Sequence, residues 1–479
     1  MRFSEFFGLR KSQAELDFID IDPDWDTRLF IDPYAIEIRD DELSSELGYH
    51  VVSFFEDVLK SLADNPDRAV DLTNNLSEPQ ETFLGMSKGQ PQGRGWGAFQ
   101  SGQLLDALRN SRAFQTGILQ DVAESELFID GIGPDKISDL TTNLIRGPLI
   151  KYTKQQCEMY GIALNPGLAI APIWDPDRRI WISEYQALPV VEGKPVILVP
   201  KIIARRRISL NSQEYYNLTV LEHLRAEHLS ANTGLVRVLK SKKRYGEKVV
   251  WKKDLREEHP FSKGFLAEIT RANPRLLEFY KELKGAQGAM SAKDLDPTLD
   301  ESALASELKE RLARIPLGKE AASEYQDCAA SIFIFLFYPH LVSPKLEAPI
   351  HEGRKRIDII FTNWSESGFF SSIKTAPQTR ARYIIIECKN YSDDLENPEF
   401  DQLTGRFSPM RGQFGIISCR EINKRESALR RCKDAAVDNR GVVILLEDSD
   451  LQTMLDFVAN RQRANISRYM EDKLRSVIL

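Results

Sequence analysis

The sequence has few cysteines and no apolar run long enough to cross a membrane. Its 479 residues include five cysteines, and no two of them have the C-x-x-C spacing of metal and redox motifs. We therefore expect neither a disulfide framework nor a cysteine-based zinc site. The longest apolar run, 329–338, is too short to span a bilayer and ends at Pro339. Because the N-terminus also lacks the apolar core of a signal peptide, we predict a cytoplasmic protein with no membrane partner.

Charge is distributed unevenly along the chain, although its net value is only −7. Residues 1–60 contain 15 acidic and 6 basic side chains, whereas residues 201–260 contain 14 basic and 7 acidic ones. The basic segment is suited to phosphate contact, and an ordinary solvated surface explains the same counts equally well. Its candidate nucleic-acid contacts are Arg205, Arg206, Arg207, Lys242, Lys243 and Arg244.

The length of the chain predicts several domains in a multidomain α/β protein. Residues 1–160 are predicted to form a mostly helical domain of unknown role, with a short strand at 16–21. Residues 161–299 are predicted to form an α+β region with basic patches and a buried strand at 195–200. These N-terminal parts are thus mixed α+β, and residues 300–479 form the last domain.

Two histidines lie in a predicted helix of the basic region. His223 and His228 are five residues apart, so they do not share a helix face as two metal ligands on one helix would. We therefore interpret both as ordinary surface or core histidines.

The hydrophobic pattern is sharpest after residue 300. Apolar residues recur at helical spacing over 303–315, and a second predicted helix, 320–338, is almost wholly apolar in its last half. Strands are predicted at 341–347, 356–361 and 383–389, and the last of these contains three consecutive isoleucines before it ends in charge.

Chemistry is indicated where these strands carry charge. Glu387 and Lys389 are two residues apart on one strand, so their side chains point to the same face. Asp358 lies inside a neighbouring apolar strand, where an ionised carboxylate is costly unless it is paired or binds a metal. Two carboxylates beside a lysine suit Mg²⁺ or Mn²⁺, with the lysine polarising the attacking water or stabilising the scissile phosphate. The alternative is an ordinary Glu–Lys pair near an unrelated Asp, and the combination favours catalysis.

The order of a buried helix, an Asp strand, an E-x-K strand and a further helix resembles the PD-(D/E)XK nuclease superfamily. The resemblance, to restriction-endonuclease-like and Mrr-like enzymes, covers about residues 318–450. The segment 387–390 (E-C-K-N) is similar to the E-C-K segment of that family, and Asp358 stands in the place of its metal-binding Asp. Ile357 replaces the proline that names the motif, a position that varies within the superfamily.

The resemblance implies a restriction-endonuclease-like core, in which a central mixed sheet is flanked by helices. It also implies a catalytic Gln402 on the next helix, with Asp401 as the alternative. A further acid is expected from Glu324 on the preceding helix or from Glu347 at the end of the first strand. The residues before Asp358 are candidate phosphate contacts: Arg354, Lys355 and Arg356.

These features predict a Mg²⁺- or Mn²⁺-dependent nuclease that hydrolyses phosphodiester bonds, namely a DNA endonuclease of bacterial restriction or anti-phage defence. One alternative is an RNase or a partner-activated, non-specific effector nuclease of the same fold. Another is a nucleic-acid-binding module that does not cut. The expected assembly is a homodimer or one subunit of a defence system. The sequence does not separate DNA from RNA, because sugar recognition depends on surface features.

Overall fold

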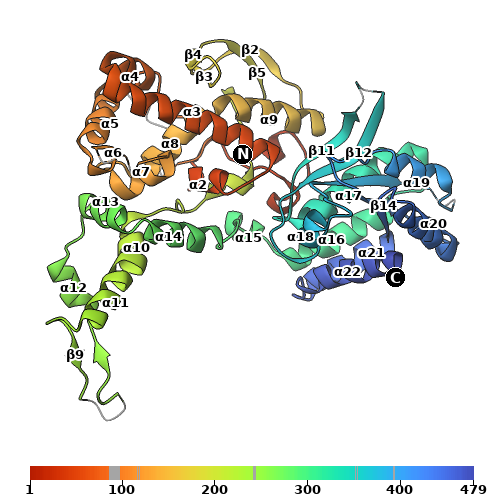
Figure 1. Cartoon of the computed structure of the whole chain (residues 1–479). Helices are drawn as coiled ribbons and strands as arrows, with labels where there is room; N and C mark the ends of the chain where they lie inside the picture. The colour runs from red at the N-terminus through yellow and green to blue at the C-terminus, as the bar shows by residue number, and fades with distance from the viewer. Residues whose placement is uncertain are drawn as a thin grey trace.

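The computed structural model describes residues 1–85, 98–115, 117, 119–240, 244–350, 352, 354–391 and 394–479. A body of helices and short hairpins contains the N-terminal part of the chain, and a second body built on one sheet contains the C-terminal part (Figure 1). Among the described residues, no helix is both long enough and apolar enough to cross a membrane.

A five-stranded mixed sheet is the centre of the C-terminal body. Its spatial order follows the chain: β11 (Leu341–Ile350), β12 (Lys355–Asn363), β13 (Tyr383–Lys389), β14 (Phe414–Cys419) and β15 (Val442–Glu447). The pairs β11–β12 and β12–β13 are antiparallel, whereas β13–β14 and β14–β15 are parallel. Every residue of β14 and β15 is buried, as expected of parallel strands covered on both faces. The predicted α/β class is therefore confirmed at the level of a mixed sheet with helices.

Helices cover this sheet on both faces (Figure 1). They are α16 (Glu301–Arg314), α17 (Ala322–Phe337), α18 (Gly368–Thr375), α19 (Asn397–Thr404), α20 (Arg425–Val437), α21 (Asp448–Ala459) and α22 (Asn465–Ile478). The hydroxyls of Tyr325 on α17 and Ser418 on β14 are 3.2 Å apart, and Ser418 pairs with Cys388 on β13. Helix α17 thus covers the face to which Cys388 points and leaves the opposite face, that of Glu387, to α19.

The N-terminal body is mostly helical. Its long helices and short elements are α1 (Phe3–Phe6), η1 (Gln13–Glu15), α2 (Pro33–Glu37), α3 (Glu42–Asp64), α4 (Pro66–Thr73), α5 (Ala98–Asn110), α6 (Arg112–Gln115), α7 (Val122–Phe128), α8 (Pro134–Leu144) and α9 (Arg146–Met159). Short antiparallel pairs follow: β2 (Asn165–Ala169) with β5 (Tyr185–Leu188), β3 (Ile173–Asp175) with β4 (Ile180–Ile182), and β6 (Val190–Val191) with β7 (Lys194–Pro195).

One hydrophobic core extends across the predicted boundary at residue 160. It contains residues from Phe30 to Tyr280 and, from the sheet body, Val342 and Trp364. Strand β1 (Phe30–Ile31) pairs with β8 (Ala204–Arg205), which follows η2 (Lys201–Ile203). The segments 1–160 and 161–299 therefore pack as one body. Helices α13 (Lys263–Ala272) and α14 (Arg275–Gly285) contribute Leu266, Ala267 and Tyr280 to this core, and α15 (Ala292–Leu295) leads to the C-terminal body.

Two strand predictions in this body were wrong. Residues 16–21 and 196–199 are buried but form no regular ladder, and a single bridge joins Phe18 to Pro200. The N–H of Ile19 donates to Val199 at 3.0 Å, and the N–H of Lys201 donates to Asp17 at 3.0 Å. Pro200 has no N–H and cannot donate a ladder hydrogen bond to residues 16–21. The alternating pattern of residues 16–21 therefore reflects their burial and not a regular strand.

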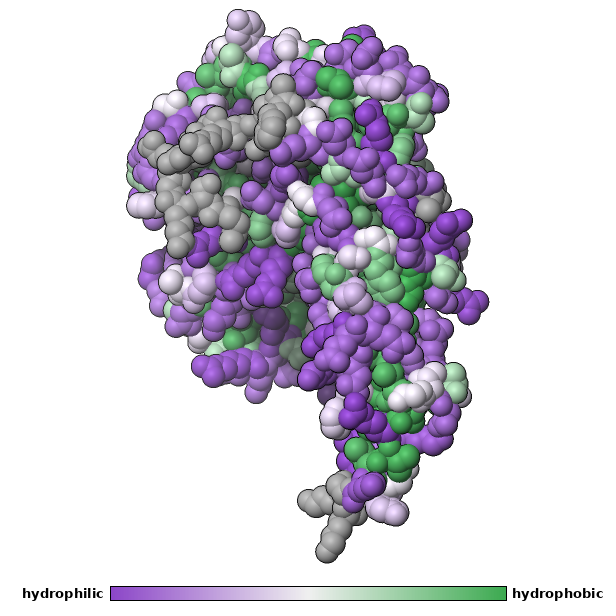
Figure 2. Space-filling view, turned by 90° about the vertical axis from the view of Figure 1, so that its left-hand side faces the viewer, coloured by the Kyte–Doolittle hydropathy of each residue, from purple (hydrophilic) through white to green (hydrophobic). Residues whose placement is uncertain are grey.

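An arm projects from the N-terminal body, at the lower left in Figure 1. After α10 (Ser212–Tyr215) and η3 (Tyr216–Val220) it consists of α11 (Leu221–Ala231), β9 (Arg237–Val238), β10 (Lys248–Val249) and α12 (Lys252–Glu258). Figure 2 shows hydrophobic residues among hydrophilic ones on its surface. Val238, Tyr245 and Trp251 are exposed there.

Polar contacts join the two bodies. Asp17 Oδ1 accepts the N–H of Ser343 at 3.1 Å, and Lys11 pairs with Asp327 at 2.8 Å. The guanidinium of Arg39 lies 4.2 Å from the ring centroid of Trp364. The start of the chain is thereby fixed against the sheet body.

Candidate active site

The ladder between β12 and β13 brings two acidic side chains together. Ile359 pairs with Ile386 in this antiparallel register, so the next position places Asp358 opposite Glu387. Directly opposed residues point to the same face of a sheet. Lys389, two residues beyond Glu387, points to that face as well.

Glu387 is fully buried and has a partner on each carboxylate oxygen. Gln402 Nε2, from α19, donates to Oε2 at 2.6 Å, and Arg406 Nε donates to Oε1 at 3.1 Å. Lys389 Nζ lies 3.8 Å from Oε2 and donates to Gln402 Oε1 at 3.0 Å. Gln402 therefore connects Glu387 to Lys389 and holds both side chains in one orientation.

Asp358 is held by the backbone of the neighbouring strand. Its Oδ2 accepts the N–H of Cys388 at 2.8 Å, which fixes the carboxylate beside the start of the E-C-K segment. Gln326 on α17 donates to the main-chain oxygen of Asp358 at 2.6 Å. The side chain and the backbone of Asp358 are thus both restrained.

Burial and mutual repulsion make both carboxylates weaker acids than usual. The pKa of Glu387 is raised to about 7, first by burial and then by the charge of Asp358, while Lys389 and Arg406 oppose the rise. Burial also raises the pKa of Asp358, against the hydrogen bond from Cys388 and the charge of Lys389. The pair therefore binds protons more readily than two isolated carboxyl groups, and a divalent cation would favour its ionised form.

The donor set fits Mg²⁺ or Mn²⁺. Both acids offer hard oxygen ligands on adjacent strands, and their mutual repulsion is what a divalent cation would relieve. Arg406 and Gln402 hold the oxygens of Glu387, so an ion at this place would take over at least one of these contacts.

The two candidates for a further acid differ in position. Glu324 is exposed on α17; Gln326, two residues later and about 200° further round the helix, is the side chain that reaches Asp358. Glu347 stands opposite Asp358 on β11, between the pairs Leu346–Ile359 and Ala348–Ile357. Its charge raises the pKa of Asp358. The structure thus aligns Glu347, and not Glu324, with the two strand acids.

Glu347 also has an uncommon backbone conformation. Its φ is +49°, in the left-handed region that costs a residue other than glycine on the order of 1 kcal/mol. Such strain is concentrated at functional sites, which agrees with a role for Glu347.

The alternative to Gln402 points away from the site. The side chain of Asp401 is 64% exposed and pairs with Arg440 at 3.1 Å. Gly405 then ends this helix. A Cβ there would lie 2.9 Å from the main-chain oxygen of Asp401, so the turn that brings Arg406 back to Glu387 requires glycine.

The basic residues before Asp358 are exposed at the start of β12. Arg354 Nη2 lies 3.9 Å from Glu352, and Arg356 Nη1 lies 3.8 Å from Glu347. Lys355 is exposed beside them. Arg356 shares the face of Asp358, because Ile357 between them points inward.

The basic residues of the middle region are separated by the fold. Arg205 donates to the main-chain oxygens of Ile202 and Ala204 at 2.9 and 2.8 Å. Arg206 donates to the main-chain oxygen of Asp294, and Arg207 is exposed.

Of the second basic group, the structure describes Arg244. Arg244 follows β9 on the arm and pairs with Glu247. Lys242 and Lys243 lie outside the described residues.

A cleft of about 1310 Å³ runs along β11 and β12 toward the N-terminal body. Glu347, Arg356 and Gln326 are among its lining residues, whereas Glu387 and Lys389 are not. The cleft therefore borders the carboxylate pair and does not contain it.

Sequence reasoning missed Arg406. It lies 19 residues after Glu387, in a turn between α19 and β14, and no spacing rule links the two. A basic residue beside a glycine was the available signal, and such a pair is common in surface turns.

The N-terminal body has a family match. The model of a domain of unknown function (DUF8370) matches residues 8–211, a segment that crosses residue 160 and ends before the sheet. An Escherichia coli (strain K12) protein named as a transposon gamma-delta 80.3 kDa protein is 25% identical over 177 residues. The match covers 36% of this chain and 25% of that protein, so the chain matches about a quarter of the length of the relative. No solved structure matches the chain.

Proposed function

We propose that this chain is a metal-dependent nuclease whose restriction-endonuclease-like catalytic region lies in residues 300–479. The observation that carries the proposal is the placement of Asp358 opposite Glu387, with Lys389 on the same face and linked to Glu387 through Gln402. An ordinary structural ion pair between Glu387 and Lys389 would need neither a second acid on the neighbouring strand nor an amide side chain that contacts both residues. Two acids with raised pKa values beside an oriented lysine are typical of a reaction centre.

Each side chain has a distinct task in this proposal. Asp358 and Glu387 would hold Mg²⁺ or Mn²⁺, which supplies Lewis-acid polarisation of the phosphate when it is bound. Lys389 places its ammonium where negative charge grows on the scissile phosphate. Gln402 accepts from Lys389 at 3.0 Å and donates to Glu387 at 2.6 Å, and so holds that ammonium beside the carboxylate.

DNA is the proposed substrate, in a bacterial restriction or anti-phage setting. The exposed Arg354, Lys355 and Arg356 at the start of β12 supply positive charge next to the acids, which suits a phosphate backbone. The name of the E. coli relative refers to a transposon, a mobile DNA element, and this agrees with a DNA substrate. An RNase of the same fold and a protein that binds without cutting are the rivals.

The experiment is a cleavage assay of the purified full chain with plasmid, linear single-stranded DNA and RNA. We expect cleavage of DNA with Mg²⁺ or Mn²⁺ and none with EDTA. Cleavage of RNA alone would establish the RNase, and binding without cleavage of any substrate under both metals would overturn the proposal.

Lys389→Met separates the nuclease from the binder. The change keeps most of the apolar stem and removes the charge, so we expect intact folding and Mg²⁺ binding with a loss of cleavage of about 10²–10³-fold. The matched control is Lys309→Met. Lys309 lies on α16 and also pairs with an acid, Asp456, but neither residue belongs to the proposed site. Full cleavage by Lys389→Met would refute the catalytic role.

A further inference from the structure

A cluster of two histidines and one glutamate lies on the arm, far along the chain from the carboxylate pair. His228 is in the last turn of α11, Glu258 ends α12, and His259 follows it. One ligand atom from each residue lies within 4.8 Å of the others. The second histidine of the pair is thus supplied by α12 and not by His223, the neighbour of His228 on its own helix.

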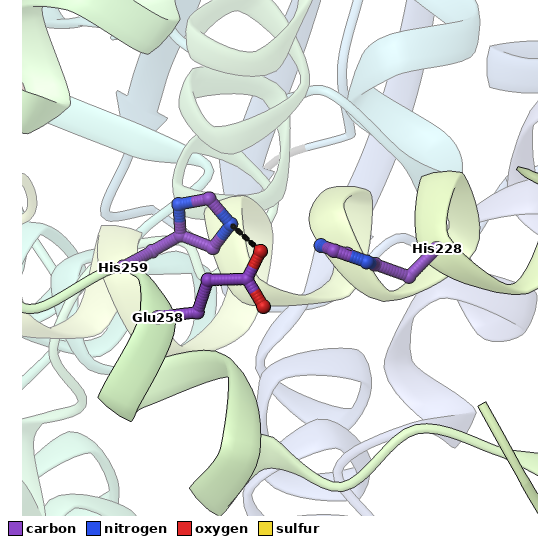
Figure 3. A group of neighbouring side chains, drawn as sticks. All are labelled: His228, Glu258 and His259. Atoms are coloured by element: carbon purple, nitrogen blue, oxygen red, sulfur yellow. Dashed lines mark ion pairs between the residues drawn. The ribbon is translucent and has the colours of Figure 1, made fainter. Parts of the chain in front are cut away.

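A hydrogen bond orients the imidazole of His228 toward the other two residues. His228 Nδ1 is 2.7 Å from Thr233 Oγ1, which leaves Nε2 to face the other two residues. Figure 3 shows that nitrogen pointing toward the Glu258 carboxylate and the His259 ring. His259 Nε2 is buried, lies 3.9 Å from Glu258 Oε1, and has no hydrogen-bond partner among the described residues.

The surrounding residues fix His259 in place. Its ring stacks on Phe265 with centroids 5.7 Å apart and an interplanar angle of 20°. The Tyr216 hydroxyl donates to its main-chain oxygen at 2.6 Å. Restraint of this kind is what a ligating histidine needs and what a freely rotating surface histidine lacks.

We propose that His228, Glu258 and His259 form a site for a zinc-class divalent cation. Two imidazole nitrogens and one carboxylate, with a fourth position for water, are a usual zinc ligand set. Tetrahedral bonds of about 2.0–2.1 Å place ligand atoms roughly 3.3 Å apart, so the three groups would close by at most about 1.5 Å. Glu258 is exposed and can make most of that movement. Imidazole ligands favour Zn²⁺ over the Mg²⁺ that suits the oxygen ligands on the sheet.

The ion would tie the two helices of the arm together. His228 and Glu258 are about 30 residues apart, and the β9–β10 hairpin lies between them. A bond network across that loop removes conformational freedom from the whole segment. Zinc would therefore set the direction in which the arm and its basic residues project.

The test is Zn²⁺ and Co²⁺ titration of the metal-stripped full chain in a Glu387→Ala background, which disables the sheet site. We expect one equivalent of Zn²⁺, and Co²⁺ absorption bands of a four-coordinate site. His228→Gln and His259→Gln should each weaken Zn²⁺ binding by at least on the order of 100-fold, since even the loss of an outer partner typically costs 10–100-fold. Hydrogen exchange of α11 and α12 should slow when Zn²⁺ binds.

Two variants on the arm serve as controls, with circular dichroism to verify folding. His223→Gln, five residues earlier on α11, should bind Zn²⁺ like the parent, because His223 pairs with Glu227 at 3.3 Å instead. Thr233→Val should weaken binding by about tenfold, because it removes the partner of His228 Nδ1. The proposal is overturned if the parent binds no more Zn²⁺ than the folded His228→Gln/His259→Gln variant, or if His223→Gln loses as much affinity as His259→Gln.

Discussion

The sheet and the arm hold their acidic and basic groups in different ways. On the sheet, the β12–β13 ladder sets the separation of Asp358 and Glu387, and Glu387 is fully buried. On the arm, the histidine cluster joins two helix ends, and its carboxylate is exposed. The first arrangement is fixed by backbone hydrogen bonds and the second by side-chain packing around His259.

This difference has chemical consequences. Burial raises the pKa values of the sheet carboxylates, so protons and a metal ion compete for the same oxygens. On the arm, the proposed metal selectivity would come from the two nitrogen ligands. A chain can thus keep two metal chemistries apart by depth of burial and ligand type.

Removal of either sheet acid should have the largest effect on cleavage. Asp358→Ala and Glu387→Ala should each lower cleavage by at least about 10³-fold, more than the loss of a single charge-stabilising donor, while nucleic-acid binding is kept. Cleavage time courses, Mg²⁺ calorimetry and gel shifts measure this. Near-parental cleavage by a folded variant would remove that residue from the site.

Neutralising the second basic group should affect nucleic-acid binding and not the metal site. Lys242→Gln/Lys243→Gln/Arg244→Gln should weaken nucleic-acid binding roughly uniformly across sequences and flatten the salt dependence by up to about 0.9 per lost contact. Mg²⁺ binding should be unchanged. Arg205→Gln is the control, because Arg205 donates to main-chain oxygens of its own segment. An unchanged salt slope in the triple variant would make the arm an ordinary solvated surface.

The pH should affect the sheet site through Glu387. Its pKa is about 7, above its ordinary value, so the carboxyl is mostly protonated at pH 6 and mostly ionised at pH 8. Mg²⁺ affinity should therefore rise by about tenfold between these values. In the metal-free protein the same group makes the folded state less stable as pH rises from about 4.5 to about 7, because the folded state then binds more protons than the unfolded state. Calorimetry at both pH values and thermal melts of Glu387→Gln test this, and a flat Mg²⁺ affinity would contradict it.

The smallest expected effect distinguishes the two candidate acids. Glu347→Gln should reduce cleavage, because Glu347 stands opposite Asp358, whereas Glu324→Gln should leave cleavage unchanged, because Glu324 is exposed on the helix that covers the other face. Steady-state rates of both variants under one Mg²⁺ concentration decide between them. The reverse order of effects would restore Glu324 to the site.

The sequence predicted the sheet body well because its strands are apolar and uninterrupted. The expected strand 383–389 matches β13, and the expected strand 356–361 lies within β12. The period-2 and period-3.6 patterns are strong when one element has to be buried in a layer. Helices α18, α21 and α22 were not predicted.

Contacts between distant segments could not be predicted from local patterns. Arg406 reaches Glu387 through a turn, and His228 meets His259 through the fold of the arm. Residues 16–21 alternate like a strand, yet their partners come from near residue 200 and from β11. Periodicity reports which side chains are buried, but it does not report what covers them.

The burial of residues 13–21 has a consequence for the order of synthesis. Asp17 accepts a hydrogen bond from Ser343, 326 residues later, and Glu15 pairs with Arg311 at 2.9 Å. During translation, this stretch therefore leaves the ribosome long before these two partners do. Until the start of the sheet has emerged, Asp17 and Glu15 lack these contacts with Ser343 and Arg311.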